Sequence, residues 1–321
     1  MDKLKAGIVG AAGYAGGELI RLLLHHPKVE LDFVLSNSQN GMKVSKVHTD
    51  LLGETELTFS NCLKESAQVI FLAMPHGKSE KFLKQNKVAD DVLIIDLSTD
   101  FRNETEGFVY GLSEVFQDKI KSSKRIANPG CFATAIQMAL APVIAKSWVQ
   151  QSIHVSGITG STGAGTIPSE TTHFSWRNQN VSSYKLFEHQ HLHEVKQTFT
   201  QLDSDFKEDI LFVPYRGNFS RGILTTAYFP FEGKLEEAQK TFANFYTSSA
   251  FVHISEEPID LKQVVNTNKC LVHIQLNSGQ LIITSIIDNL LKGASGQAVQ
   301  NMNLHFGWKE NLGLQLKGNA Y

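Results

Sequence analysis

A glycine-rich turn near the start of the chain constrains its fold more than any other feature. Gly10, Gly13 and Gly16 follow the apolar segment 4–9 and precede a helix-like stretch, 18–24, whose leucines share one stripe. Glycine permits a tight turn and lets the backbone approach a pyrophosphate at a helix N-terminus. The spacing is a variant of the dinucleotide-binding fingerprint. A dinucleotide-binding unit is therefore predicted, the alternative being a glycine turn without a ligand.

The first 130 residues alternate between strand-like and helix-like segments. The apolar runs 69–72 and 92–95 fit strands buried on both faces, and 79–85 between them has a helical pattern. This alternation predicts a Rossmann-type unit, in which helices cover a parallel sheet.

After Pro129 the expected strands follow one another closely, which favours an antiparallel or mixed sheet. The expected strands are 153–158, 210–213, 223–231, 270–276 and 281–287, and the expected helices are 132–145, 192–202, 235–246 and 296–304. The predicted fold class is α/β, with an N-terminal Rossmann-type parallel-sheet domain and an α+β domain.

Composition argues against several functions. Lys and Arg number 30 and Asp and Glu number 32, a net charge of −2 without a basic surface for nucleic acid. No apolar run approaches the roughly 20 residues of a membrane helix, and glycines, Glu18 and Arg21 interrupt the apolar start that a signal peptide would need. Because Cys62, Cys131 and Cys270 are too few for a disulfide framework, we expect a cytoplasmic protein with reduced thiols.

The segment 36–43, after the second expected strand, indicates the type of cofactor. NAD-binding domains usually place an acidic residue there, which bonds the ribose hydroxyls. This segment holds hydroxyls, amides and Lys43 but no acid. Such groups accept a 2′-phosphate, so NADP(H) is predicted, the alternative being a simple polar loop.

Cys131 follows Asn128, Pro129 and Gly130 where a turn enters an expected helix. The positive end of the helix dipole favours a thiolate at such a position. A cysteine at a helix start is often structural, but a thiolate near a nicotinamide suits hydride transfer to or from a thioester. Cys62 and Cys270 lack this setting.

The densest titratable cluster is 188–194, which contains His189, His191 and His193. A general base for the cysteine is the favoured interpretation. On a strand the three imidazoles would share a face and could bind zinc, but the helical pattern of 192–202 weakens that alternative. A solvated helix start is the third.

A second glycine loop, 157–165, lacks the Gly-Lys-Ser/Thr ending of a P-loop. It could hold the substrate phosphate or the nicotinamide, or shape a turn. Arg102 and Arg221 are the arginines expected to bind anions, because guanidinium grips phosphate and carboxylate bidentately.

These motifs together resemble the N-acetyl-gamma-glutamyl-phosphate reductase family of arginine biosynthesis over nearly the whole length. The segments that carry the resemblance are 10–18, 96–102, 110–114, 128–131, 157–165, 189–191 and 288–303. The related aspartate-semialdehyde dehydrogenases share the architecture but surround their cysteine differently.

The resemblance implies that the Cys131 thiolate attacks an acyl phosphate, phosphate leaves, and NADPH reduces the thioester to a semialdehyde. It implies His189 as the base, with His191 the close alternative. No metal is expected. The resemblance divides the chain into an NADP-binding domain, 1–130 with 290–321, and a catalytic and oligomerisation domain, 131–289, that forms a homodimer or homotetramer. The predicted cofactor-binding residues are Gly10, Ala12, Gly13, Tyr14, Ala15, Gly16, Ser36, Ser38, Lys43, Pro75, Ser161, Gly163 and Asn289, and the predicted substrate-binding residues are Arg102, Asn128, His191 and Arg221.

Two segments depart from the family pattern. Many members carry an arginine between the two histidines, where this chain has Gln190, and 214–221 differs from the commoner Pro-His-x-x-Pro. Acetyl is the expected N-acyl group, with succinyl the alternative. The competing functions are a phosphorylating dehydrogenase of aspartate semialdehyde, a metal-dependent hydrolase and a nucleotide-binding regulatory protein.

Overall fold

The structure is a computed structural model that describes residues 3–319. The chain forms two compact units. The first runs to Gly130 and is completed by Ala294–Gln315, and the second comprises Cys131–Gly293 and the chain from Leu316. Residues 290–293 and 316–319, which were predicted to belong to the first domain, belong to the second unit in this division. There the backbone N–H of Asn319 donates to the carbonyl of Val265.

The first unit contains a six-stranded sheet in the order β2-β1-β3-β4-β6-β5, and every neighbouring pair is parallel. Its strands are β1 (Leu4–Val9), β2 (Val29–Leu35), β3 (Val69–Leu72), β4 (Leu93–Asp96), β5 (Val109–Tyr110) and β6 (Arg125–Ala127). β3 and β4 are buried at every residue, as expected for apolar runs covered on both faces. The parallel sheet predicted for the N-terminal part is confirmed.

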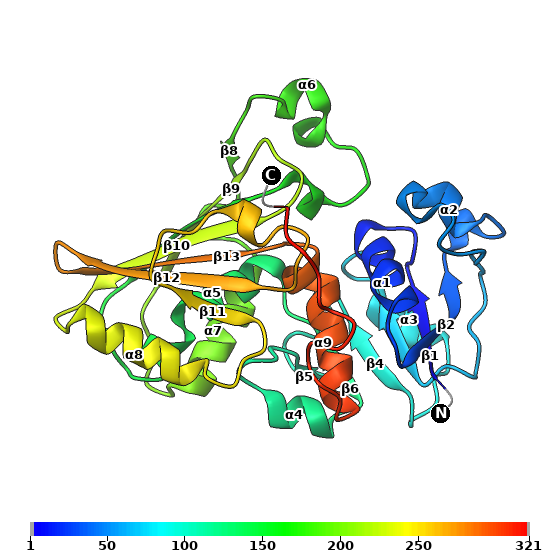
Figure 1. Ribbon diagram of the computed structural model, residues 1–321, viewed down its shortest axis with the longest axis horizontal. Helices are drawn as coiled ribbons and strands as arrows, with labels where there is room; N and C mark the ends of the chain where they lie inside the picture. Colours follow the sequence, from blue (N-terminus) through cyan, green and yellow to red (C-terminus); the bar gives the residue numbers. More distant parts are fainter. Residues whose placement is uncertain (1–2, 320–321) are drawn as a thin grey trace. The chain divides into compact units, whose positions relative to one another are not determined.

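Helices of the first unit are α1 (Tyr14–Leu24), α2 (Val44–Val47), α3 (Ser79–Gln85), α4 (Gln117–Ser122) and α9 (Gly296–His305). α1 buries Leu19, Leu22 and Leu23. Leucines at this spacing lie on one side of a helix, and that side faces the core. α9 comes from the far end of the chain and packs against β4, α1 and α4 (Figure 1).

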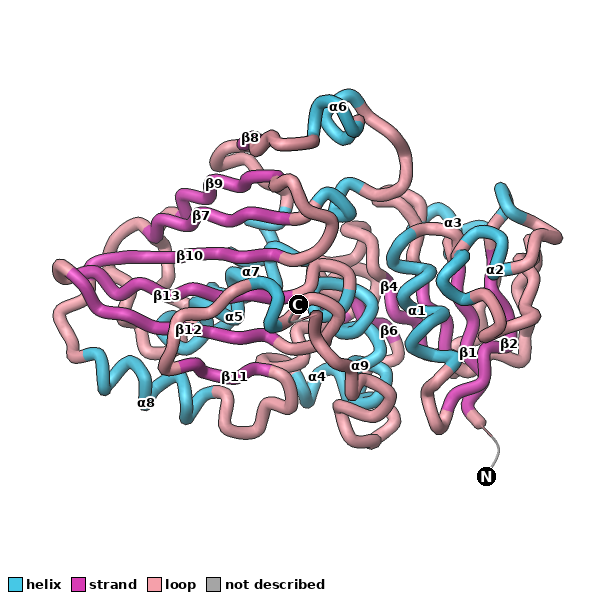
Figure 2. The backbone as a smooth tube through the Cα atoms, turned by 45° about the horizontal axis from the view of Figure 1, so that its top comes forward, coloured by secondary structure: helices cyan, strands magenta, loops and turns pink. Residues whose placement is uncertain are grey.

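The second unit contains a seven-stranded mixed sheet in the order β11-β12-β13-β10-β7-β9-β8 (Figure 2). Its strands are β7 (Ile153–Thr159), β8 (Ser182–Ser183), β9 (Ile210–Arg216), β10 (Ile223–Pro230), β11 (Val252–Ser255), β12 (Cys270–Asn277) and β13 (Gln280–Ile287). β12, β13, β10 and β7 form antiparallel neighbours, whereas β7–β9 and β11–β12 are parallel. The predicted mixed sheet is confirmed.

Helices α5 (Cys131–Ile144), α7 (His191–Leu202) and α8 (Leu235–Phe245) belong to this unit, together with the short α6 (Phe174–Arg177). α5 packs on β10 and β13 and contacts α7 and α8, so these helices cover one face of the sheet. α5 is buried from Phe132 to Ile144, and Pro142 lies within it. A π-helical turn, Leu291–Ser295, carries the chain back into the first unit.

Candidate functional residues in the two units

The glycine turn of the first unit has the geometry of a dinucleotide-binding turn. Gly10 has φ +81°, and a Cβ there would lie 2.6 Å from the carbonyl oxygen of Ala73, so only glycine fits. Gly13 caps α1 in an extended conformation and offers no side chain to the free N–H groups of the first helical turn. A Cβ on Gly13 would meet nothing closer than the Gly10 carbonyl oxygen at 3.8 Å. This open helix N-terminus fits a pyrophosphate.

The other predicted cofactor residues of this unit lie at or near the carboxyl ends of β1, β2 and β3. Gly16 is buried, Ala12 and Ala15 are half-buried, and Tyr14 is 43% exposed. Pro75 is exposed and lies three residues after β3. The structure thus brings these residues to one edge of the sheet, where parallel-sheet proteins bind ligands.

The segment predicted to accept a 2′-phosphate contains two hydroxyls in contact, since Ser36 Oγ lies 3.3 Å from Ser38 Oγ. Lys43 Nζ forms an ion pair of 2.6 Å with Glu56 Oε2. Sequence reasoning missed Glu56, which lies 13 residues further along the chain. Both side chains are more than half exposed. Such a pair contributes little stability, so an incoming phosphate can compete for the lysine.

Asn128 and Arg102 hold the turn that precedes Cys131. The backbone N–H of Asn128 donates to the Asp96 carbonyl at 2.7 Å, and Arg102 Nε donates to the Asn128 carbonyl at 3.0 Å. The side-chain amide of Asn128 accepts from Asn301 Nδ2 at 3.1 Å and donates to the Ala294 carbonyl at 3.0 Å. Through these hydrogen bonds Asn128 and Arg102 stabilise the turn. Contact of either residue with substrate stays a prediction.

Cys131 is the first residue of α5 and is partly exposed. Cys62 is exposed outside the helices and strands, and Cys270 is buried in β12. Only Cys131 therefore combines access with the positive end of a helix of 14 residues. A thiol in that position ionises more readily than a free one.

His189 is buried, 4% exposed, immediately before α7. Edge-to-face contacts join its ring to Phe132, Tyr184 and Phe212, with ring centroids 5.5–5.7 Å apart. Burial, and then the charges of Lys185 and Arg216, lower the pKa of His189 to about 4. The imidazole is therefore neutral near pH 7.

One hydrogen bond assigns the tautomer of that neutral ring. The backbone N–H of His191 donates to His189 Nδ1 at 3.2 Å. Because Nδ1 accepts, the proton of the neutral ring resides on Nε2, which makes Nε2 a donor. The predicted base for a thiol would need the other tautomer, so this bond favours hydrogen-bond donation by His189.

The other two histidines of the cluster lie in the first turn of α7. His191 is buried and its Nε2 lies 3.9 Å from Glu194 Oε1. The strand arrangement that would align the three imidazoles for zinc is not formed. Within residues 3–319, no group of three or more His, Cys, Asp or Glu side chains is placed to hold a metal ion.

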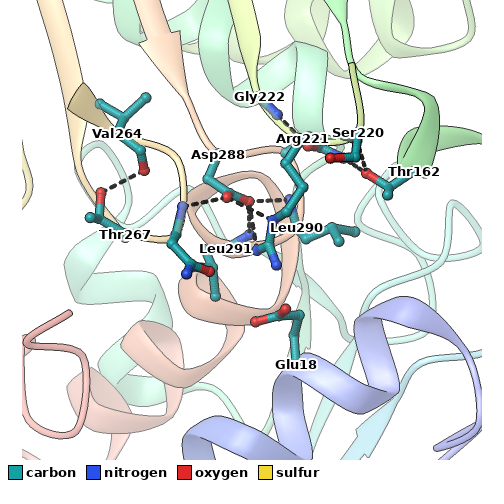
Figure 3. Close-up of polar contacts among 12 residues, drawn as sticks. Glu18, Thr162, Ser220, Arg221, Gly222, Val264, Thr267, Asp288, Leu290 and Leu291 are labelled. Carbon is teal, nitrogen blue, oxygen red and sulfur yellow. Dashed lines mark hydrogen bonds and ion pairs between the residues drawn. The ribbon is translucent and has the colours of Figure 1, made fainter. Parts of the chain in front are cut away.

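Arg221 forms a bidentate ion pair with the buried Asp288 (Figure 3), with Nε–Oδ2 3.0 Å and Nη2–Oδ1 3.1 Å. The same carboxylate accepts from the backbone N–H groups of Asn266, Leu290 and Leu291. Arg221 was predicted to bind substrate, and this carboxylate already holds its guanidinium. Its contact with substrate stays a prediction.

Asn289 connects this cluster to the second glycine loop. Its Oδ1 accepts from the Gly222 N–H at 2.8 Å, and its Nδ2 donates to Thr162 Oγ1 at 3.0 Å. Ser161 and Gly163, also predicted to bind cofactor, lie in the same short turn, Ser161–Ala164, where Ser161 is half-buried and Gly163 exposed. The structure therefore brings these three predicted residues together.

Sequence reasoning missed Tyr184 and Arg216. The Arg216 guanidinium carbon lies 4.8 Å from the centroid of the Tyr184 ring. Burial and then the Cys131 charge raise the pKa of Tyr184 to about 12, while Arg216 lowers it. The only signal for Arg216 in the sequence was the unusual segment 214–221.

Gly293 was missed as well. A Cβ on this residue would lie 2.8 Å from the Cβ of Cys131 and 3.2 Å from its Cα. The π-helical turn therefore approaches the cysteine too closely for any side chain at this position.

Comparison with known proteins identifies two domains. Residues 5–123 match the semialdehyde dehydrogenase NAD-binding domain, and residues 131–289 match the semialdehyde dehydrogenase dimerisation domain. No helix within residues 3–319 is long and apolar enough to cross a membrane.

Full-length relatives carry a more specific name. N-acetyl-gamma-glutamyl-phosphate reductase from Christiangramia forsetii is 53% identical over 320 residues, covering 99% of this chain and 100% of the relative. The protein of the same name from Phocaeicola vulgatus is 50% identical over 321 residues, with the same coverage of both chains.

Solved structures share the fold at low identity. Aspartate semialdehyde dehydrogenase II from Vibrio cholerae, complexed with ASA, has a TM-score of 0.76 at 16% identity and covers 96% of this chain and 99% of that one. Aspartate semialdehyde dehydrogenase with NADP from Candida albicans has a TM-score of 0.69 at 14% identity, with 97% and 100% covered. This likeness is evidence for the fold alone.

Proposed function

We propose, from the premise that the chain belongs to the N-acetyl-gamma-glutamyl-phosphate reductases, that it reduces N-acetyl-gamma-glutamyl phosphate to N-acetylglutamate semialdehyde with NADPH. The identity of about half of all residues over the full length supports this activity. The structural observation that carries the proposal is the partly exposed Cys131 as first residue of α5.

Cys131 is the nucleophile in this proposal. Its sulfur attacks the acyl carbon, the bond from that carbon to the phosphate oxygen breaks, and phosphate leaves with the electron pair. The product of this step is a thioester on Cys131. The dipole of α5 supports the thiolate that the attack requires. Because that thiol has to stay reduced, we expect the protein in the cytoplasm.

NADPH, when bound, supplies the hydride that reduces the thioester. The residues that fit its pyrophosphate are those of the Gly10–Gly16 turn and the N-terminus of α1. Ser36, Ser38 and Lys43 fit a 2′-phosphate, because they offer hydroxyls and an ammonium without an acid among residues 36–43. A preference for NADPH over NADH follows.

His189 acts on the oxygen that becomes negative when the thioester is attacked. Its neutral ring carries the proton on Nε2, so it can donate a hydrogen bond to an oxyanion without first taking up a proton. His189 is thus assigned as the acid, and ionisation of Cys131 is assigned to the helix N-terminus.

The second unit matches a dimerisation domain, and we propose a homodimer as the minimal assembly. α5 and α8 pack on one face of the seven-stranded sheet. The opposite face carries apolar and aromatic side chains that are only partly buried: Leu211, Val213, Leu224, Tyr228 and Ile282. Apolar side chains left partly exposed on a sheet face fit association with a second copy.

The test is a phosphate-dependent assay in the oxidative direction. Purified protein is given N-acetylglutamate semialdehyde, NADP⁺ and inorganic phosphate, and NADPH formation is followed. The proposal predicts continuous NADPH formation that requires phosphate. Parallel assays with aspartate semialdehyde and with N-succinylglutamate semialdehyde identify the substrate, and higher kcat/KM for either would overturn the acetyl assignment.

A further inference from the structure

Arg216 lies at the end of β9, where three strands of the second unit meet. It pairs in register with Thr159, the last residue of β7, and with Ser182 of β8. The part of the second glycine loop that lies beyond β7 begins directly after Thr159, at Gly160. Arg216 is therefore at the edge of the sheet that carries Ser161 and Gly163.

Tyr184 contacts the Arg216 guanidinium, and the same phenol senses the charge of Cys131. The Tyr184 ring in turn contacts the ring of His189, with centroids 5.7 Å apart. One tyrosine thus connects Arg216, Cys131 and His189 within a single unit.

Arg216 differs from the other two arginines of this unit in its partners. Arg177 donates to the carbonyls of Thr171, Asn180 and Arg216 and to Ser182 Oγ, and Arg221 is paired with the Asp288 carboxylate. Arg216 Nε is buried and has no hydrogen-bond partner among residues 3–319. No carboxylate of the described residues forms an ion pair with this guanidinium. The nearby charges are also positive: Arg177 interacts with Arg216, and Lys185 interacts with His189.

A partly buried cation with an unused donor, among other cations, is unfavourable until an anion binds. Guanidinium is the side chain best suited to a planar carboxylate or a phosphoryl group, because it donates two parallel hydrogen bonds. The substrate of the proposed reaction carries both kinds of oxyanion.

We infer that Arg216 binds an oxyanion of the substrate, the α-carboxylate or the γ-phosphoryl group, on the Tyr184 side of Cys131. The inference rests on the proposed function for the identity of the substrate, and on the unit's own geometry for the anion site. Arg216 is then a substrate-binding residue in the segment 214–221, where the chain departs from its family.

Kinetics in the oxidative direction separate the two sources, because the semialdehyde carries only the carboxylate and inorganic phosphate is a separate substrate. Arg216→Met is expected to raise KM for one of these two by about 10- to 100-fold, the loss of one charge-assisted contact, with a much smaller change in kcat. A higher KM for the semialdehyde assigns the carboxylate, and a higher KM for phosphate assigns the phosphoryl group. Arg216→Lys is expected to recover part of the affinity, because lysine keeps the positive charge but cannot donate two parallel hydrogen bonds.

The matched control is Lys185→Met. Lys185 is also a cation near His189, but its Nζ is bonded to Gln190 Oε1 at 2.7 Å and its side chain is exposed. This variant is expected to leave both KM values near those of the parent. An equal rise in KM in Lys185→Met, or unchanged KM values with a lower kcat in Arg216→Met, would overturn the inference. Circular dichroism melting curves establish that each variant is folded.

A second readout does not need turnover. Inorganic phosphate and N-acetylglutamate are tested separately for slowing the alkylation of Cys131 by iodoacetamide. We expect at least one of them to protect the parent protein and to lose that effect in Arg216→Met, and protection that persists in the variant would contradict the inference. If an anion protects Cys131 in the parent but the parent forms no NADPH from semialdehyde and phosphate, the proposed function is wrong and the anion site is still supported.

Discussion

His189 lies between aromatic rings and close to two cations, and both features keep its imidazole neutral. Because its pKa is lowered to about 4, the ring takes up a proton only well below the pH at which a free histidine does. Activity should therefore not fall between pH 7 and pH 5 through protonation of His189. Removal of a neighbouring cation raises this pKa, so Lys185→Met should move any acid limb of His189 to higher pH.

His189→Asn is expected to lower turnover by about 10² to 10⁴, the usual contribution of a positioned acid or base. His193→Asn is the control, since it lies within α7 outside the predicted site. The pH dependence of iodoacetamide labelling at Cys131 then distinguishes the role. An unchanged apparent pKa of the thiol in His189→Asn supports the acid, whereas a raised one would restore the base assigned from the sequence. A raised value only in His191→Asn would identify the neighbouring histidine instead.

Ser36 is the residue on which cofactor choice is tested. This residue is 7% exposed, follows directly after β2, and its hydroxyl contacts that of Ser38. Ser36→Asp places a carboxylate where it repels a 2′-phosphate and bonds a ribose hydroxyl. We expect the ratio of NADPH to NADH affinity, measured by fluorescence titration, to exceed one in the parent and to fall in the variant. Equal affinities in the parent would contradict the preference for NADP(H).

At the scale of the elements, the turn Leu291–Ser295 packs closely against the start of α5. Gly293 leaves no room for a side chain because a Cβ would lie 2.8 Å from that of Cys131. Gly293→Ala should displace the cysteine or the turn and destabilise the fold by about 1–3 kcal/mol, as overpacking usually does. The expected readouts are a lower kcat, a lower melting temperature and a changed alkylation rate at Cys131. Parent-like values for all three would show that the approach is looser than described.

Long or strongly apolar elements were predictable from the sequence, and short ones were not. β1, β3 and α3 have the predicted bounds, because their apolar or amphipathic patterns are decided by burial. β5, β8 and the four-residue helices α2 and α6 were missed. Unlike the fully buried apolar β3, these segments of two to four residues carry too little pattern to identify, and neighbouring segments determine their conformation.

The candidate site was predictable only where a residue type carries its own chemistry. Cys131 and the glycine turn were identified because a thiol at a helix start and glycines between a strand and a helix each indicate a particular chemistry. Glu56, Tyr184 and Arg216 were not identified, because their partners are distant in sequence or belong to other elements. The sequence also could not show that Arg221 is paired with Asp288, 67 residues away.

At the scale of the whole molecule, assembly is the property that the second unit should control. Tyr228 is 41% exposed and stacks on His154 across β10 and β7, with ring centroids 5.1 Å apart. Tyr228→Asp combined with Ile282→Asp places two charges on the apolar sheet face and should dissociate the dimer. Light scattering after size exclusion should give at least twice 35.6 kDa for the parent and about the monomer mass for the variant.

Leu52→Asp is the control for assembly, because Leu52 is 79% exposed in the first unit and is not among residues 131–289, which match the dimerisation domain. It should leave the mass of the parent unchanged. A monomeric parent protein, or a double variant that keeps the parent mass, would show that the sheet face is not the interface.

The central claim is a covalent acyl group on Cys131, and a single-turnover measurement without phosphate tests it most directly. The parent, mixed with N-acetylglutamate semialdehyde and NADP⁺, should form NADPH in a burst equal to the number of Cys131 sites, and mass spectrometry should find an N-acetylglutamyl group on Cys131. Added phosphate should then start continuous turnover, and Cys270→Ser should behave as the parent. A burst that survives in Cys131→Ser, or sustained turnover without phosphate and without an adduct, would contradict the account.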